Sequence, residues 1–112
     1  MSHITTGELA LWQAQGFDFE LLDVRRAGVR AEHGAQIAGA HWHDPAAWLD
    51  WKDSIGTTRP AVLYCAKGYE IGQGLTTTLR VLGVDARYLV GGMQGWLEEG
   101  RPVAPIIFST KA

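Results

Sequence analysis

Residues 61–72 read AVLYCAKGYEIG, and this stretch decides the fold class. The first four residues are apolar and predict a buried strand, because a short apolar run between turn residues is typical of a strand covered on both faces. A short loop containing Gly68 follows. Residues 72–82 then carry leucines at helical spacing up to Gly83, which predicts an amphipathic helix with a glycine stop. The stretch therefore predicts a strand, a tight loop and a helix in succession.

The rest of the chain shows the same alternation of strands and helices. Further strands are expected at residues 19–24, 39–43 and 86–90. Further helices are expected to begin at Thr5 or Thr6, at Asp44-Pro45 and after Gly91-Gly92. Strands that alternate with helices predict an α/β fold with a largely parallel sheet. In such a sheet, ligands bind beyond the carboxyl ends of the strands.

Composition and charge exclude several classes of protein. The chain has 112 residues, which suits one compact domain, expected at residues 1–104 with an apolar tail at 105–112. A formal net charge of −2 argues against a protein that coats nucleic acid or an anionic membrane. No apolar run is long enough to span a bilayer, and the first residues do not resemble a signal peptide. We therefore expect a cytoplasmic domain, with its oligomeric state left open.

Cys65 is the single cysteine, and it follows the clearest apolar strand where a loop leads into a helix. Backbone N–H groups of such a loop point inward and favour an anion at its centre, so a sulfur there is stabilised as the thiolate. The helix terminus contributes up to about 1–2 kcal/mol. Each hydrogen bond to the charged sulfur adds roughly 1.5–3 kcal/mol. An inert, buried cysteine fits the same position equally well, so position alone leaves both interpretations open.

Four motifs occur in a fixed order along the chain. They are LLDVR (21–25), IAGA (37–40), CAKG (65–68) and LVGGMQGW (89–96). Together they resemble a single-domain rhodanese, a sulfurtransferase, over almost the whole chain. The resemblance implies a five-stranded, mainly parallel sheet with helices on both faces. It also implies that Cys65 attacks a sulfane sulfur donor, becomes a persulfide and passes the outer sulfur to a thiophilic acceptor.

The resemblance also assigns roles around Cys65, which corresponds to the nucleophile. The expected substrate-binding loop consists of Ala66, Lys67, Gly68, Tyr69 and Glu70. Asp23 and Arg25 are expected to support the site through a salt bridge, and Gly91-Gly92 to hold the backbone close beneath the loop. The expected partners are thiosulfate or a persulfide as donor, and cyanide, a small thiol or a protein thiol as acceptor. No metal or cofactor is expected.

The loop departs from the rhodanese pattern at Glu70, where the family usually has Arg, Ser or Thr. A carboxylate there repels thiosulfate by about 1 kcal/mol at ~4 Å in water, and by more where water is excluded. The sequence therefore predicts poor use of thiosulfate and better use of a persulfide of low charge. Ile71 lies six positions after Cys65, where a cysteine phosphatase needs an arginine, which disfavours that reaction.

Other features leave an alternative function open. A protein-docking or sulfur-relay module of the same fold fits the motifs, whereas a redox sensor is disfavoured because the chain has no resolving cysteine. The tryptophans within residues 42–51 are interpreted as cover for one sheet edge, with a partner surface as the alternative. The apolar residues 106–108 are expected either to pack back on the domain or to present an unpaired edge for a dimer. His41 and His43 lack a further ligand at metal-binding spacing.

Overall fold

The computed structural model describes residues 2–68 and 70–106, except for the side chain of Glu70. Its centre is a five-stranded sheet in the order β1-β6-β5-β2-β4. The strands are β1 (His3–Ile4), β2 (Glu20–Asp23), β4 (His41–Trp42), β5 (Ala61–Tyr64) and β6 (Ala86–Leu89). Each strand is parallel to its neighbours. This arrangement confirms the predicted α/β fold and its mainly parallel sheet.

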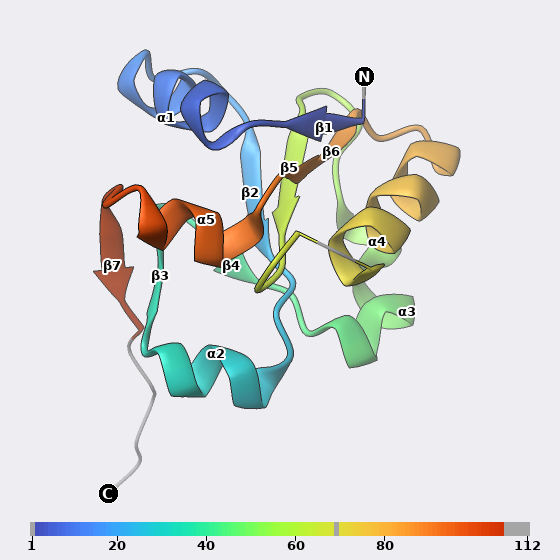
Figure 1. Cartoon of the computed structure of the whole chain (residues 1–112). Coiled ribbons are helices and arrows are strands. Elements are labelled where there is room, and N and C mark those ends of the chain that lie inside the picture. The colour runs from blue at the N-terminus through green and yellow to red at the C-terminus, as the bar shows by residue number, and fades with distance from the viewer. Residues whose placement is uncertain (1, 69, 107–112) are drawn as a thin grey trace, which may run out of the picture.

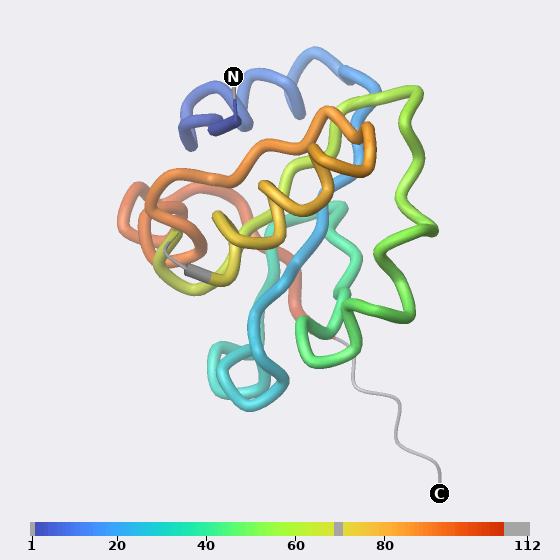
Figure 2. The backbone as a smooth tube through the Cα atoms, turned by 90° about the vertical axis from the view of Figure 1, so that its right-hand side faces the viewer, coloured from blue at the N-terminus to red at the C-terminus, as the bar shows by residue number. Residues whose placement is uncertain are grey.

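Helices cover both faces of the sheet, as predicted. On one face lie α1 (Thr6–Ala14) and α5 (Gly92–Glu98), and on the other lie α4 (Glu70–Val81) and the short α3 (Trp48–Trp51) (Figure 1). Figure 2, seen from the side of α4, shows this helix crossing in front of the strands. Because successive strand residues point to opposite faces, each face has its own apolar core. Leu21 and Val62 pack on the α1–α5 face, and Leu22 and Leu63 on the α4 face.

The start of α1 follows from its sequence. The Thr5 hydroxyl accepts a hydrogen bond from the Glu8 N–H (3.1 Å), and the Thr5 N–H donates to the Glu8 carboxylate (3.0 Å). This reciprocal capping satisfies two N–H groups that have no partner within the helix. The hydrogen bond from the Thr5 backbone also lowers the pKa of Glu8. Of the two expected capping residues, Thr5 and Thr6, the helix therefore uses Thr5.

Several short elements were not predicted. They are β1, α2 (Ala27–His33), and an antiparallel pair formed by β3 (Ala35–Ile37) and β7 (Val103–Pro105). No residue of α2 is buried, so its sequence carries no amphipathic pattern. The strand expected at 39–43 covers only β4, because Gly39 forms a left-handed turn (φ +84°) before it. The helix expected from Asp44-Pro45 is divided into the 3-10 turn η1 (Pro45–Ala47), α3 and the 3-10 turn η2 (Lys52–Ser54).

The segment predicted as an apolar tail begins inside the packed structure. Pro105 ends β7, and the Ile106 N–H donates a hydrogen bond to the Gly34 carbonyl (3.0 Å). Ile107 and Phe108 lie outside the described residues. The domain boundary at residue 104 therefore stays a prediction. Within the described parts of the chain, no helix has the length and apolar character needed to cross a membrane.

Candidate active site

The topology brings two loops together at one edge of the sheet. Strands β2 and β5 are neighbours, with Asp23 paired to Tyr64, so the residues that follow them lie side by side. A pocket of about 360 Å³ opens there. It is lined by Arg25, Arg26, Val29, Cys65, Ala66, Lys67 and Ile71. The structure thus places four of the sequence-predicted site residues, Cys65, Ala66, Lys67 and Arg25, around one pocket. Tyr69 and the side chain of Glu70 lie outside the described part.

Cys65 lies at the base of this pocket and is only 6% exposed. Its Sγ accepts a hydrogen bond from the Gly68 N–H at 3.1 Å. Gly72, in the first turn of α4, borders the sulfur closely, since a Cβ at this position would lie 3.5 Å from Sγ. The loop therefore curls around the sulfur and donates an amide to it.

The loop is fixed from beneath by the start of α5. The N–H groups of Met93 and Gln94 donate to the carbonyls of Cys65 (2.9 Å) and Ala66 (2.8 Å). These contacts need glycine at Gly92 (φ +57°), because a Cβ there would lie 2.5 Å from the Cys65 carbonyl oxygen. With the carbonyls directed toward α5, the loop turns the Gly68 amide toward the sulfur.

Asp23 and Arg25 form a buried ion pair behind the pocket, and both side chains are fully buried. The Arg25 Nη2 lies 2.7 Å from Asp23 Oδ2, and Nε donates to Oδ1 at 2.9 Å. Arg25 Nη2 also donates to the Ala35 carbonyl (2.9 Å), which ties the end of β2 to β3. Burial lowers the pKa of Arg25, but the hydrogen bonds and charge of Asp23 raise it, and the net shift is upward. The guanidinium therefore stays charged.

Tyr64 completes this network, although the sequence places it in an apolar strand and does not single out its hydroxyl. Its hydroxyl accepts a hydrogen bond from the Ile37 N–H at 3.2 Å, and its ring lies 5.5 Å from the Arg25 guanidinium carbon. Burial raises the pKa of Tyr64, and the charge of Asp23 raises it further. A tyrosine at the end of a strand, beside an Asp–Arg pair on the next strand, is the signal that could have revealed it.

Arg26 is a second residue that the sequence analysis missed. It is exposed, lines the pocket together with Lys67, and gives the rim a second cation. The available signal was its place directly after the LLDVR motif. No group of three or more His, Cys, Asp or Glu side chains within residues 2–68 and 70–106 is arranged to hold a metal ion.

Comparisons with solved structures agree on the fold. A rhodanese-related protein from Thermoplasma volcanium is 22% identical, with a TM-score of 0.80 over 93% of this chain and 98% of that one. A rhodanese-like domain protein from Staphylococcus aureus is 26% identical, with a TM-score of 0.77 over 86% of this chain and 91% of the other. A Rhodopseudomonas palustris protein of unknown function, described as a possible tyrosine phosphatase, is 21% identical, with a TM-score of 0.78 over 93% and 85% of the two chains.

The sequence itself decides the family. No curated protein matches the chain significantly. The family model of the rhodanese-like domain, however, matches residues 5–99, a range that includes strands β2, β4, β5 and β6 of the sheet and the whole Cys65 loop. The chain therefore belongs to the rhodanese-like domain family.

Proposed function

We propose that the protein is a sulfurtransferase that carries sulfur as a persulfide on Cys65. The observation that supports this most directly is the position of the Cys65 Sγ, which lies at the base of a pocket and accepts the Gly68 N–H. A thiolate is the nucleophile of a cysteine, and an amide donor together with nearby cations favours the thiolate. Arg26 and Lys67 supply those cations at the rim of the pocket.

The reaction takes place in two steps, sulfur uptake by Cys65 and sulfur transfer to the acceptor. The Cys65 thiolate attacks the outer sulfur of the donor, the bond from that sulfur to the donor breaks, and its electron pair leaves with the donor. When thiosulfate is the donor, the leaving group is sulfite. When a persulfide is the donor, the leaving group is a thiolate. The acceptor then attacks the outer sulfur of the Cys65 persulfide, the S–S bond breaks, and the thiolate is restored. No external oxidant or reductant is needed.

A test of the first step is intact mass spectrometry after incubation with thiosulfate and, separately, with glutathione persulfide. Wild-type protein gains the mass of one sulfur atom, cyanide removes it, and the Cys65→Ser variant gains none. If neither donor adds sulfur to folded wild-type protein, the proposed activity is wrong. That result would favour the second candidate, a docking or relay module of the same fold.

Donor choice is proposed to depend on Glu70. Its carboxylate opposes the attraction that Arg26 and Lys67 exert on an anionic donor, so thiosulfate is used less well than a persulfide of low charge. Glu70→Arg replaces repulsion by attraction and should raise kcat/KM for thiosulfate roughly fivefold or more. Glu70→Gln, which only removes the charge, should give a smaller increase. Unchanged kcat/KM in both variants would contradict this role.

Phosphatase chemistry is not favoured by the site. Ile71, where such an enzyme needs a guanidinium to bind phosphate oxygens, packs with Leu75 against the apolar core of the α4 face. An isoleucine offers no hydrogen-bond donor to a phosphate.

A further inference from the structure

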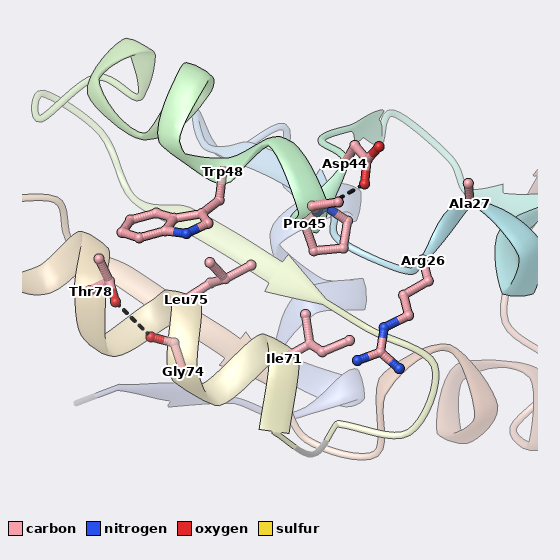
Figure 3. A pocket seen from close by; sticks show the side chains of 10 residues that line it. Arg26, Ala27, Asp44, Pro45, Trp48, Ile71, Gly74, Leu75 and Thr78 are labelled. Carbon is pink, nitrogen blue, oxygen red and sulfur yellow. Dashed lines mark hydrogen bonds between the residues drawn. The ribbon is translucent and has the colours of Figure 1, made fainter.

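A groove adjoins the Cys65 pocket and shares Arg26 and Ile71 with it. Its volume is about 780 Å³, about twice that of the pocket. One wall comes from η1 and α3 and the other from α4 (Figure 3). Besides Ile71, its lining side chains include Arg26, Asp44, Pro45, Trp48, Leu75 and Thr78. In Figure 3 the Trp48 ring lies across from Leu75, and the Arg26 guanidinium points toward Ile71 at the end nearer the loop.

The groove combines apolar walls with polar groups, among them the guanidinium of Arg26, the indole N–H of Trp48 and the carboxylate of Asp44. The Asp44 carboxylate already has a partner, because it accepts a hydrogen bond from the Ala46 N–H (3.0 Å). The Arg26 guanidinium makes no hydrogen bond or ion pair with any of the described residues. The indole N–H groups of Trp42 and Trp51 donate to the carbonyls of Arg25 (2.9 Å) and Asp44 (2.8 Å), but that of Trp48 has no acceptor within the described chain. A ligand that fits this groove therefore offers an anion near Arg26 and an apolar group near Trp48.

The dimensions indicate an extended peptide. From Ile71 to Thr78, α4 rises roughly 10 Å, which equals about three residues of extended chain. Thiosulfate and cyanide are too small to reach beyond the Cys65 pocket into this length. Leu49, the residue after Trp48, is 67% exposed and adds an apolar side chain to the accessible surface of α3. An accessible apolar surface of this kind is typical of a contact with another protein.

We infer that this groove binds the segment of a protein acceptor that carries the receiving cysteine. The inference rests on the proposed sulfurtransferase function. The acceptor cysteine enters the Cys65 pocket, an acidic residue beside it pairs with Arg26, and an apolar or aromatic residue further along packs between Trp48 and Leu75. The acceptor thiolate attacks the outer sulfur of the Cys65 persulfide, the S–S bond breaks, and the Cys65 thiolate is restored while the acceptor becomes the persulfide.

The experiment follows sulfur transfer from persulfide-loaded full-length protein to two capped peptides of opposite order, Cys-Glu-Gly-Phe and Phe-Gly-Glu-Cys. Their controls replace Glu by Lys and Phe by Ser. Cyanide and glutathione are measured in parallel. We expect one peptide order to react at least tenfold faster than its control. We also expect Trp48→Ala to lower the ratio of peptide rate to cyanide rate at least fivefold. Trp12→Ala, an aromatic truncation on the opposite face of the sheet, should leave that ratio unchanged.

Gly74 provides a variant that fits the fold, because a Cβ there meets open space on the groove side of α4. Gly74→Glu should slow transfer to the acidic peptide, and Gly74→Lys should not. Equal rates for peptides and controls would overturn the proposed binding of the acceptor segment in the groove, and so would glutathione reacting as fast as either peptide. Either result would leave the sulfurtransferase function in place. Failure of wild-type protein to take up sulfur would instead overturn both.

Discussion

Two neighbouring loops at the carboxyl edge of the sheet are stabilised by opposite means. The loop after β5 is held through its backbone, because its carbonyls accept the first amides of α5 and its sulfur accepts the Gly68 N–H. The loop after β2 is held through side chains, by the buried pair of Asp23 and Arg25. The first arrangement leaves Ala66 and Lys67 free to line the pocket. The second uses its charged groups for structure and presents a rigid wall to the pocket.

The largest effect on stability should come from removing the buried ion pair of Asp23 and Arg25. Asp23→Ala leaves the Arg25 guanidinium fully buried without its carboxylate, which should lower the free energy of unfolding by about 3–5 kcal/mol. Urea denaturation followed by circular dichroism measures this. The control is Asp18→Ala, since the Asp18 side chain is 80% exposed and its ion pair with Arg59 should contribute less than about 1 kcal/mol. A similar loss of unfolding free energy in both variants would refute the stabilising role of the Asp23–Arg25 pair.

The loop after β5, which is held through its backbone, should be most sensitive to substitution of Gly92. An added Cβ at its φ of +57° would press on the Cys65 carbonyl oxygen, so Gly92→Ala should destabilise the fold by about 1–3 kcal/mol. Sulfur transfer should fall at least tenfold, because the loop must move away from α5. Gly74→Ala has open space within α4 and should stabilise the protein by about 0.5–1 kcal/mol. Full transfer activity in folded Gly92→Ala would show that the loop is not positioned through this contact.

The sequence predicted the backbone-held loop better than its surroundings. Strand, cysteine, glycine and helix follow one another within residues 61–72, so local patterns were sufficient. The pairing of Asp23 with Arg25 was also expected, from the resemblance, and the two residues lie close in sequence. By contrast, β3 and β7 come from distant parts of the chain, and each is short and mostly unburied. Such strands carry no hydrophobic period from which they could be predicted.

The residues that complete the site were harder to find for a related reason. Tyr64 has an apolar ring and a polar hydroxyl, and only the tertiary structure shows that the hydroxyl meets the Ile37 N–H. Arg26 and Trp48 lie in separate segments with no shared motif, and they border one groove because η1 and α3 pack across from α4. The family resemblance named the residues around the sulfur. It did not extend to the surface beside them.

Tyr64 offers a smaller and pH-dependent test of the side-chain network. Tyr64→Phe leaves the buried Ile37 N–H without its acceptor and should cost about 1–2 kcal/mol at pH 7. The pKa of Tyr64 is raised above its ordinary 10.0, chiefly by burial, so the unfolded chain loses this proton at a lower pH than the folded protein. The contribution of neutral Tyr64 to the free energy of unfolding is therefore complete below pH 10 and declines as the pH rises above 10. Urea denaturation at pH 7 to 11 should show a steeper decline in wild type than in Tyr64→Phe. Parallel declines would refute this contribution.

The smallest effect on stability should come from a side chain that the backbone-held loop leaves free. Lys67 is exposed on the rim of the Cys65 pocket, so Lys67→Gln should change the free energy of unfolding by less than about 0.5 kcal/mol. Loss of its charge should nevertheless lower kcat/KM for thiosulfate about fivefold at low salt. The difference should shrink as sodium chloride is raised, because salt screens exposed charges. Lys52→Gln, which removes an equal charge from η2, should leave thiosulfate kinetics unchanged. A loss of stability above 1 kcal/mol in Lys67→Gln would mean that side chains, too, hold this loop in place.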